Sequence, residues 1–519
     1  MASRLKEVFS RIERETVKVL GAAVLIKPFL DGIKVAEIVN SYTSDGSEIR
    51  HGDVIEILTI NRLTAPRPLY YIEHWAKGTA IEEIYGLDWE KLNDDRCRRS
   101  LQAIFPHLSD IWTDIVTSAV VKYNIPIDSI IYDLTSLYFE GEYEESKIIE
   151  YGYSRDKKPE KVQVNLGVNV TQDKIPLTYD LHAGSTADRK TVLDNMRKLQ
   201  ELREKLADQC KEPLLITGDG KTISDEIVIK YHEKGVQYLA PVEITEERKE
   251  IVLSVTEGEF EKHKLDYKDR SKGTYWGVFR PITFKYNSRT IIDKVMVVKS
   301  ETKLKRDRKN REKAINRIKD KLKHIESKLN QRKYKNKDYV KMMAKKAIEG
   351  SRAKKYFYFA VKGEYGNLSF KWGLQYERIK EDEKLDGKYM IATNKDFDSE
   401  EVALTTYKGR NKVEQRISTL KSTLRIRPLF LEKDEMIASL VFVIMLSLLI
   451  YSIIEMLCRK QLENMTARKA FFAFEYLSII CYYFRDCSKL VKVSGLGPPQ
   501  DEILSALGIQ KPNEYIDYC

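Results

Sequence analysis

The clearest pattern of hydrophobic and polar positions lies between residues 126 and 242, where short apolar segments alternate with amphipathic ones. Three segments rich in β-branched and aromatic residues, separated by turn residues, predict an antiparallel meander. A helix, a short buried strand, a second helix and a last strand are expected after it. The predicted strands are DSIIYDLTSLYF (128–139), KVQVNLGVNV (161–170), IPLTYDL (175–181), PLLIT (213–217) and VQYLAP (236–241), and the helices cover 183–205 and 222–234.

The resulting order, β-β-β-α-β-α-β, is that of an α/β protein with a ribonuclease H-like (retroviral integrase-like) core. This core needs one more helix, but the next clear one starts only beyond residue 400. We therefore predict that a β-rich insertion with a basic helical segment (303–355) interrupts the core, and that a helical N-terminal domain precedes it. The predicted domains are 1–125 (mainly helical), 126–242 (first part of the core), 243–400 (insertion), 401–460 (remainder of the core) and 461–519 (a C-terminal helical region).

The segment YKGRNKVEQRISTLK (407–421) combines a polar strip with an apolar stripe. On a single helix, which turns by about 100° per residue, one carboxylate, two cations and one phenol share a strip about 60° wide. Such a helix can pack on a core and hold a carboxylate among phosphate-binding groups; the alternative is an amphipathic helix with solvated charges. The strip contains Tyr407, Arg410, Glu414 and Lys421, and the stripe contains Val413, Ile417, Leu420 and Leu424.

Two aspartates in the predicted sheet are candidate partners of Glu414. Asp133 lies in the middle of an apolar strand, where a carboxylate is costly unless it is paired, hydrogen-bonded or bound to a metal. Asp219 comes just after a strand. It is flanked by Gly218 and Gly220, which allow close backbone approach. The first and fourth strands of this core are neighbours, so the three carboxylates are expected to meet, and without His or Cys they suit Mg²⁺ or Mn²⁺. Each also has a plainer explanation. Asp133 is then a strand residue with local hydrogen bonds, Asp219 a turn residue and Glu414 a surface residue.

Charge is distributed unevenly along the chain. Residues 303–355 contain 22 Lys/Arg and 6 Asp/Glu, a net charge of +16, which leaves −5 for the rest of a protein whose net charge is +11. Such a basic segment is typical of contact with a polyanion, most often nucleic acid. Apolar residues at heptad-like spacing predict a long helix or helical hairpin, which leaves DNA contact, dimer contact and a solvated helix as explanations. These residues are Ile315, Ile318, Leu322, Ile325 and Leu329.

Cysteine usage and one apolar segment bear on the compartment. The six cysteines include no CxxC pair, which indicates neither a zinc site nor a disulfide framework and fits a reducing cytoplasm. Residues 436–457 are apolar and numerous enough to span a bilayer. The segment is solitary and follows the amphipathic helix after a short loop containing Pro428. We therefore predict a buried core helix and no membrane association.

Together these motifs resemble the DDE transposases of bacterial and archaeal insertion sequences, specifically the IS-four-like group. That group carries Tyr-x2-Arg-x3-Glu-x6-Lys around its third acidic residue, and the spacing in 407–421 matches it. YDLTSLYFEG around Asp133 and ITGDGKTISD around Asp219 resemble the family's two aspartate motifs, although many relatives have Asp-Arg-Gly at the second. LDGKYMIATN (385–394) and LRIRPLFL (424–431) also look like the family.

The resemblance implies metal-dependent cleavage of DNA at the transposon ends and strand transfer into target DNA. It implies two divalent ions, Mg²⁺ or Mn²⁺, a homodimer that binds terminal inverted repeats, and a cytoplasmic, nucleoid-associated prokaryotic protein. By the same comparison the N-terminal region is expected to bind the DNA end. A ribonuclease H-like nuclease or resolvase and a non-catalytic, domesticated DNA-binding descendant are the alternatives. The implied catalytic and metal-binding residues are Asp133, Asp219 and Glu414, and the implied DNA-binding residues are Tyr407, Arg410 and Lys421.

Overall fold

The computed structural model describes residues 11–43, 46–140, 143, 145–153, 158, 160–186, 188–268, 273–426, 433–486, 488–512 and 515–518. Its chain forms two compact units, one of Met1–Thr217 with Gly409–Cys519 and the other of Gly218–Lys408. The sequence LRIRPLFL lies partly, and the predicted loop around Pro428 lies wholly, outside the described residues.

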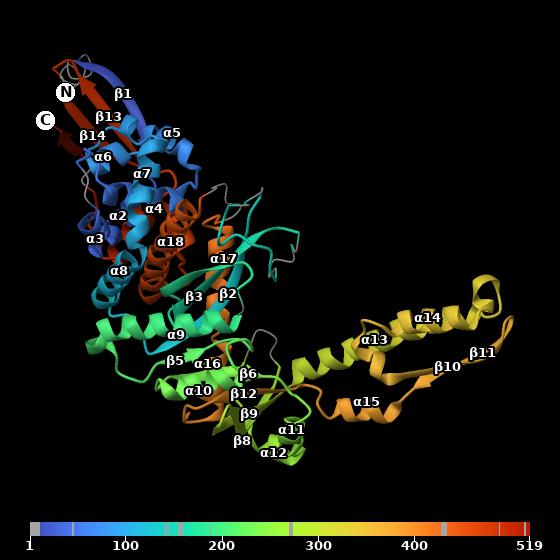
Figure 1. Ribbon diagram of the computed structural model, residues 1–519. Coiled ribbons are helices and arrows are strands. Elements are labelled where there is room, and N and C mark those ends of the chain that lie inside the picture. Colours follow the sequence, from blue (N-terminus) through green and yellow to red (C-terminus); the bar gives the residue numbers. More distant parts are fainter. Residues whose placement is uncertain are drawn as a thin grey trace. The chain divides into compact units, whose positions relative to one another are not determined.

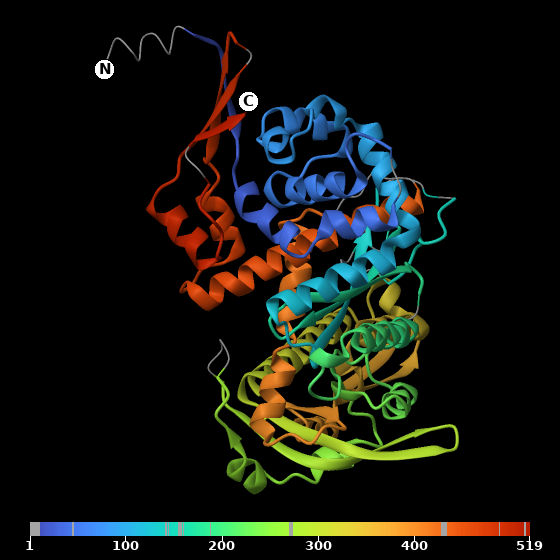
Figure 2. The ribbon, with the colours of Figure 1, turned by 90° about the vertical axis from the view of Figure 1, so that its left-hand side faces the viewer.

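In the first unit, four of the N-terminal helices, α2, α4, α7 and α8, contact one long apolar helix, α18 (Asp434–Gln461), as Figure 2 shows. α18 contains the predicted apolar segment 436–457. It is the one helix, among those described, that is long and apolar enough to cross a membrane, and 94% of its most apolar stretch is buried inside the protein. Such burial is what a core helix shows. The N-terminal helices are α2 (Ala23–Gly32), α3 (Val35–Tyr42), α4 (His51–Thr64), α5 (Ile72–Lys77), α6 (Ile81–Tyr85), α7 (Asp94–Ile104) and α8 (Leu108–Tyr123).

The same unit contains the predicted meander. β2 (Ser129–Tyr138), β3 (Gln163–Thr171) and β4 (Pro176–Ala183) pair antiparallel, and β5 (Leu215–Thr217) pairs parallel to β2 on its other side. Helix α9 (Asp188–Lys205) connects β4 to β5. In the second unit, α10 (Asp225–Glu233) and β6 (Gln237–Val242) follow along the chain. The predicted order β-β-β-α-β-α-β is therefore confirmed, and the fold is mixed α/β.

The second unit shows how strands of the predicted β-rich insertion (243–400) pair with β6. β12 (Lys388–Thr393) pairs antiparallel with both β6 and β9 (Arg289–Ser300), so strands of the predicted insertion continue the sheet that contains β6. The order is β6-β12-β9-β8-β7. Residues 243–302 are also not all strand, because two short helices precede β7. The remaining elements are α11 (Lys249–Leu253), α12 (Glu257–Lys262), β7 (Lys264–Leu265), β8 (Tyr275–Tyr286) and α16 (Glu400–Lys408).

Residues 301–383 form an elongated arm of the second unit with a hydrophobic core of its own (Figure 1). The basic segment is helical, as predicted, and α13 (Glu301–Ser327) and α14 (Lys337–Ile348) pack on the hairpin of β10 (Phe357–Glu364) and β11 (Asn367–Leu374), which α15 (Tyr376–Glu383) follows. The heptad-like residues face this core: Ile318, Leu322 and Ile325 are buried, and Ile315 and Leu329 pack against them. The apolar seam is thus used within the chain.

The C-terminal region differs from its predicted helical character. Among the residues described after α18, only α19 (Ala467–Ala473) and α20 (Pro498–Ala506) are α-helices. β13 (Ser478–Phe484), β14 (Lys489–Ser494) and β15 (Tyr515–Tyr518) form a sheet with β1 (Ile12–Val19) at the other end of the chain, which Figure 2 shows as red strands beside a blue one. The physical reason lies in the composition of SIICYYF, whose β-branched and aromatic residues favour a strand once a partner is available.

Candidate active site

Asp133 lies in the middle of β2, as predicted, opposite Val168 of β3. Residues directly opposite in neighbouring strands share a face of the sheet, so Asp133, Val168 and its other partner Tyr179 of β4 lie on one face. The Trp112 ring packs on Tyr179 and on Phe442 of α18, so α18 covers this face. Helix α9 covers the opposite face, where Asn195 donates a hydrogen bond to Asn169, the residue after Val168 in β3. The half-buried Asp133 carboxylate accepts a hydrogen bond of 2.9 Å from the backbone N–H of the next residue.

The helix that carries Glu414, α17 (Asn411–Ser422), packs against β2, β3 and α18 (Figure 1). The predicted apolar stripe is confirmed, because all four of its residues are buried. Glu414 lies beside the stripe with 57% of its side chain exposed. Its Oε1 atom is 3.5 Å from the guanidinium of Arg410, and Lys421 lies half-buried two turns further along the helix. The buried stripe residues are Val413, Ile417, Leu420 and Leu424.

One part of the helical prediction is wrong. Residues 407–421 do not form a single helix, because α16 ends at Lys408, Gly409 and Arg410 form a turn, and α17 begins at Asn411. Glycine is among the poorest helix formers, which explains the break at this position. Tyr407 therefore belongs to α16 and to the second unit. Arg410, Glu414 and Lys421 remain together in the first unit.

Asp219 lies in a tight turn at the start of the second unit. Its carboxylate accepts from the backbone N–H of Lys221 at 2.9 Å, and its carbonyl accepts from the hydroxyl of Thr222 at 2.6 Å. A Cβ atom on Gly218 would lie only 2.2 Å from that hydroxyl oxygen, so this turn requires glycine at 218. Gly220 has no such constraint, since its Cβ would meet only the carbonyl oxygen of Pro241 at 3.6 Å.

Four of the predicted site residues lie in the first unit and two in the second. Asp133 and Glu414 lie on elements of the first unit that pack against each other. Asp219 and Tyr407 belong to the second unit. Within the residues that the structure describes, no group of three or more His, Cys, Asp or Glu side chains could hold a metal ion. The donor chemistry of Asp133 and Glu414, two carboxylates without sulfur or imidazole, nevertheless fits a hard divalent cation.

A buried ionic network fixes α17 in place, and the sequence did not reveal it. The Arg416 guanidinium lies 3.1 Å from the Glu455 carboxylate of α18, and Arg459 approaches the same carboxylate at 2.7 Å. Arg416 also donates through Nε to the carbonyl of Lys174, in the turn between β3 and β4, at 2.8 Å. Burial lowers the pKa of Arg416. These contacts tie the Glu414 helix both to the sheet and to α18.

Two lysines beside this network make its surroundings electropositive. Lys174 donates to the Gln415 amide oxygen at 2.6 Å, and Lys412 donates to the Gln172 amide oxygen at 2.9 Å. Burial, reinforced by nearby arginines, lowers the pKa of Lys174 to about 8, and burial also lowers the pKa of Lys412. The only sequence signal was the high density of cations in 408–416.

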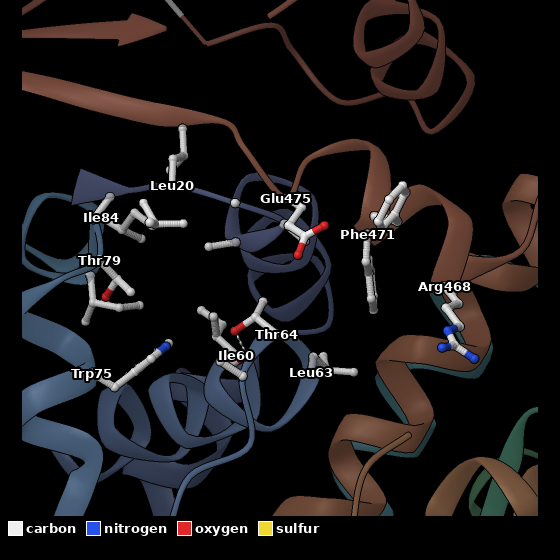
Figure 3. A pocket seen from close by; sticks show the side chains of 18 of the residues that line it. Leu20, Ile60, Leu63, Thr64, Trp75, Thr79, Ile84, Arg468, Phe471 and Glu475 are labelled. Atoms are coloured by element: carbon white, nitrogen blue, oxygen red, sulfur yellow. Dashed lines mark hydrogen bonds between the residues drawn. The ribbon is translucent and has the colours of Figure 1, made fainter. Parts of the chain in front are cut away.

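Two cavities of the first unit lie apart from these residues. One, of about 640 Å³, is lined by apolar side chains of α4, α5 and α19, with Trp75 and Ile60 on one side and Phe471 on the other (Figure 3). Its charged lining residues are Arg425, Arg468 and Glu475, of which Figure 3 labels the last two. The other, of about 770 Å³, lies between α8, β4 and α9. None of the predicted site residues lines either of these two cavities.

Comparison of the sequence with known protein families shows which family the chain belongs to. A family described as "Transposase DDE domain" matches residues 126–450, more than half of the chain. The protein belongs to the transposase DDE domain family. A second family, a "Domain of unknown function (DUF4277)", matches residues 15–117 of this DDE transposase. No curated protein matches it.

Two solved structures show limited similarity to this DDE transposase. A piggyBac transposase synaptic complex with hairpin DNA is 9% identical, with a TM-score of 0.41, over 89% of this chain and 82% of that chain. A Mos1 transposase paired-end complex with the left transposon end is 10% identical, with a TM-score of 0.16, over 34% of this chain and 60% of that chain. TM-scores this low do not establish a common fold.

Proposed function

We propose that this protein is an insertion-sequence transposase that cleaves DNA at the ends of its element and transfers the cut strands into target DNA. Asp133, Asp219 and Glu414 are the catalytic carboxylates of the proposal. The observation that carries it is the placement of Asp133 on the sheet face that α18 covers, with Glu414 on α17, which contacts the same strand and α18, in a chain of the transposase DDE domain family.

In this proposal the three carboxylates hold two divalent ions, Mg²⁺ or Mn²⁺. When bound, such ions supply the positive charge that lowers the pKa of an attacking water and stabilises the leaving oxygen. Asp133 is held in the middle of a paired strand, and Glu414 lies on a helix anchored by Arg416. Both therefore belong to rigid elements, which is where ligands of a precise site are best placed.

Arg410, Lys421 and Tyr407 are the proposed contacts to phosphates of the transposon end. Arg410 is close enough to Glu414 to place a phosphate beside the carboxylate, and guanidinium groups bind phosphate oxygens in a bidentate manner. In the cleavage step the water oxygen bonds to phosphorus and the 3′ oxygen leaves. In strand transfer the freed 3′-hydroxyl oxygen bonds to a target phosphorus as the target's own 3′ oxygen leaves. Two ends must be joined, so we expect a homodimer on DNA.

The test is cleavage of a labelled repeat end by purified protein in Mg²⁺. Inverted repeats flanking the gene supply the sequence of that end. We expect cleavage at the repeat boundary in the wild type and none above background in Glu414→Gln or Asp133→Asn. Glu204→Gln is the matched control, because Glu204 is an exposed carboxylate on α9, which covers the other face of the same sheet. Circular dichroism and thermal unfolding verify that each variant is folded.

Three outcomes would contradict the proposal. Normal cleavage by Glu414→Gln would remove that residue from the site. Specific binding without cleavage by the wild type would favour a domesticated DNA-binding protein. Cleavage of branched DNA without regard to the repeat would favour a ribonuclease H-like nuclease or resolvase.

A further inference from the structure

The loop between α13 and α14, in the arm, encloses a hollow of about 480 Å³. It is lined almost entirely by cationic, amide and phenolic side chains, and none of its described lining residues is Asp or Glu. Tyr334 and Tyr339 meet edge to face there, with ring centroids 5.1 Å apart. The lining residues, which we call the tip site, are His324, Lys328, Gln331, Arg332, Lys333, Tyr334 and Tyr339.

The loop that forms the tip site is held in a defined conformation. Asn330 and Arg332 have φ angles of 61° and 44°, a region that side chains other than glycine rarely adopt. Asn330 offsets this cost with two hydrogen bonds to the backbone of Leu368 in β11, at 2.7 and 2.9 Å. Leu329 and Tyr334 pack on the core of the arm. The hollow is therefore built by the fold of the arm.

The cations of the tip site are not neutralised by the protein. Lys328, Arg332 and Lys333 are exposed, and within the described residues they form no ion pair. Other cations of the arm do have carboxylate partners, such as Arg311 with Asp386. The nearby Glu326 instead accepts a hydrogen bond of 3.2 Å from the indole N–H of Trp372. The positive potential at the tip is thus available to a ligand.

A strip of exposed cations leads along α13 to the tip site. At about 100° per residue these positions fall within about 120° of each other, on a face turned away from the buried seam. Asp320 is the one acidic residue in the strip. The helix has 27 residues and is therefore about 40 Å long, which corresponds to about 12 base pairs of duplex at 3.4 Å each. The residues of the strip are Arg306, Lys309, Lys313, Arg317, Lys321 and Lys328, and all six are exposed.

We propose that the tip site and this strip bind the phosphodiester backbone of duplex DNA, with one phosphate seated among Lys328, Arg332 and Lys333. The length of the strip favours a long polyanion over a single small anion. The choice of DNA as the polyanion rests on the proposed function. Contacts of this type carry no sequence information, so the arm strengthens binding and sets its register without reading bases.

The test is binding of a fluorescent duplex to the full chain, measured by anisotropy over a range of salt concentrations. We expect the double variant Arg332→Ala/Lys333→Ala to bind more weakly. The negative slope of log K against log salt should become about 2 less steep, since each phosphate contact contributes about −0.9 to it. The matched control is Lys262→Ala/Lys268→Ala, which removes two exposed cations of the same unit outside the arm. Lys321→Ala tests the strip without changing the loop. Its slope of log K against log salt should become less negative by about 1.

Binding is measured in the Glu414→Gln background without divalent ions, so its outcome does not depend on catalysis. Equal slopes for the tip variant and the control would overturn the proposed site, even if the wild type cleaves repeat ends normally. The converse result is a wild type that cleaves no repeat end and a tip variant that shows a less steep salt dependence. This result would support the tip site and reject only the catalytic proposal. Stronger competition by duplex RNA than by duplex DNA of the same length would overturn the assignment to DNA.

Discussion

The guanidinium of Arg416 lies 3.1 Å from the carboxylate of Glu455, and both side chains are almost completely buried between α17 and α18. Arg416 lies only two residues after Glu414 on α17, so this ion pair anchors the part of the helix that carries Glu414. A buried pair adds little net stability over an apolar pair, but losing one partner is costly because a buried charge is left behind. The pair therefore fixes where α17 lies.

We expect Arg416→Ala to lower the free energy of unfolding by about 3 kcal/mol, the lower end for a broken buried pair, because Arg459 still contacts Glu455. Urea unfolding followed by circular dichroism measures this loss. The control is Arg197→Ala, which breaks the exposed pair of Arg197 with Glu201 at 3.0 Å and should cost less than about 1 kcal/mol. Equal losses in the two variants would show that the network has no special role.

The two glycines beside Asp219 provide a second prediction. Gly218→Ala places a methyl group 2.2 Å from the Thr222 hydroxyl, which closes the Asp219 turn. We expect this variant to lose about 1–3 kcal/mol of stability through overpacking and to lose DNA cleavage, because Asp219 shifts. Gly220→Ala meets only an ordinary contact at 3.6 Å, so it should keep both. A Gly218→Ala protein with normal cleavage would place Asp219 outside the active site.

The parts of this fold that follow from the spacing of apolar residues along the chain could be predicted from the sequence. The apolar stripe of α17 was predictable because Val413, Ile417 and Leu420 recur at helical spacing, and all are buried. The order of strands and helices from β2 to β6 was predictable for the same reason. Asp133 was placed in its strand by its apolar neighbours. Its role in catalysis remains a prediction.

Features that depend on distant partners were not predictable. Nothing near Arg416 indicates that its partner is Glu455, which is 39 residues away. Pairing of β12 with β6 and β9 depends on which strand edge is available, so the sequence did not show that strands of the insertion join the sheet that contains β6. The break at Gly409 was visible in the sequence, but the signature spacing across it favoured a single helix. The low helix propensity of a single glycine is a weak signal compared with the signature spacing that spans it.

A third prediction concerns pH and the buried carboxylate of Glu56. This side chain is 0% exposed, lies 3.2 Å from the Lys27 ammonium and accepts a hydrogen bond of 3.0 Å from the Tyr85 hydroxyl. Burial raises the pKa of Glu56 above its ordinary value of 4.5. The folded protein therefore binds this proton more tightly than the unfolded chain, and the stability that results is present below pH 4.5 and is lost as the pH rises through the folded pKa.

We expect Glu56→Gln to reduce the loss of stability between pH 4.5 and pH 7, because the variant has no proton to release at this position. Thermal unfolding at the two pH values measures the effect as a difference in Tm. Glu37→Gln is the control, since Glu37 is exposed and lies 3.8 Å from the exposed Lys34. If the wild type and Glu56→Gln had the same pH dependence, burial of a charged carboxylate at this position would be ruled out as its cause.

The last prediction separates packing within the arm from contact between copies of the chain. The heptad-like spacing that contains Leu322 is compatible with a coiled-coil dimer, yet Leu322 is completely buried against α14 and the β10–β11 hairpin of the same chain. Leu322→Ala removes buried methyl groups and should therefore lower the stability of the arm by about 2–5 kcal/mol. Amide hydrogen exchange measures this locally, as faster exchange confined to α13, α14 and the hairpin. Met342→Ala is the control, because Met342 is 52% exposed on α14. If the seam instead joined two chains, Leu322→Ala would lower the dimer fraction in analytical ultracentrifugation, and arm exchange in the monomer would equal that of the wild-type monomer.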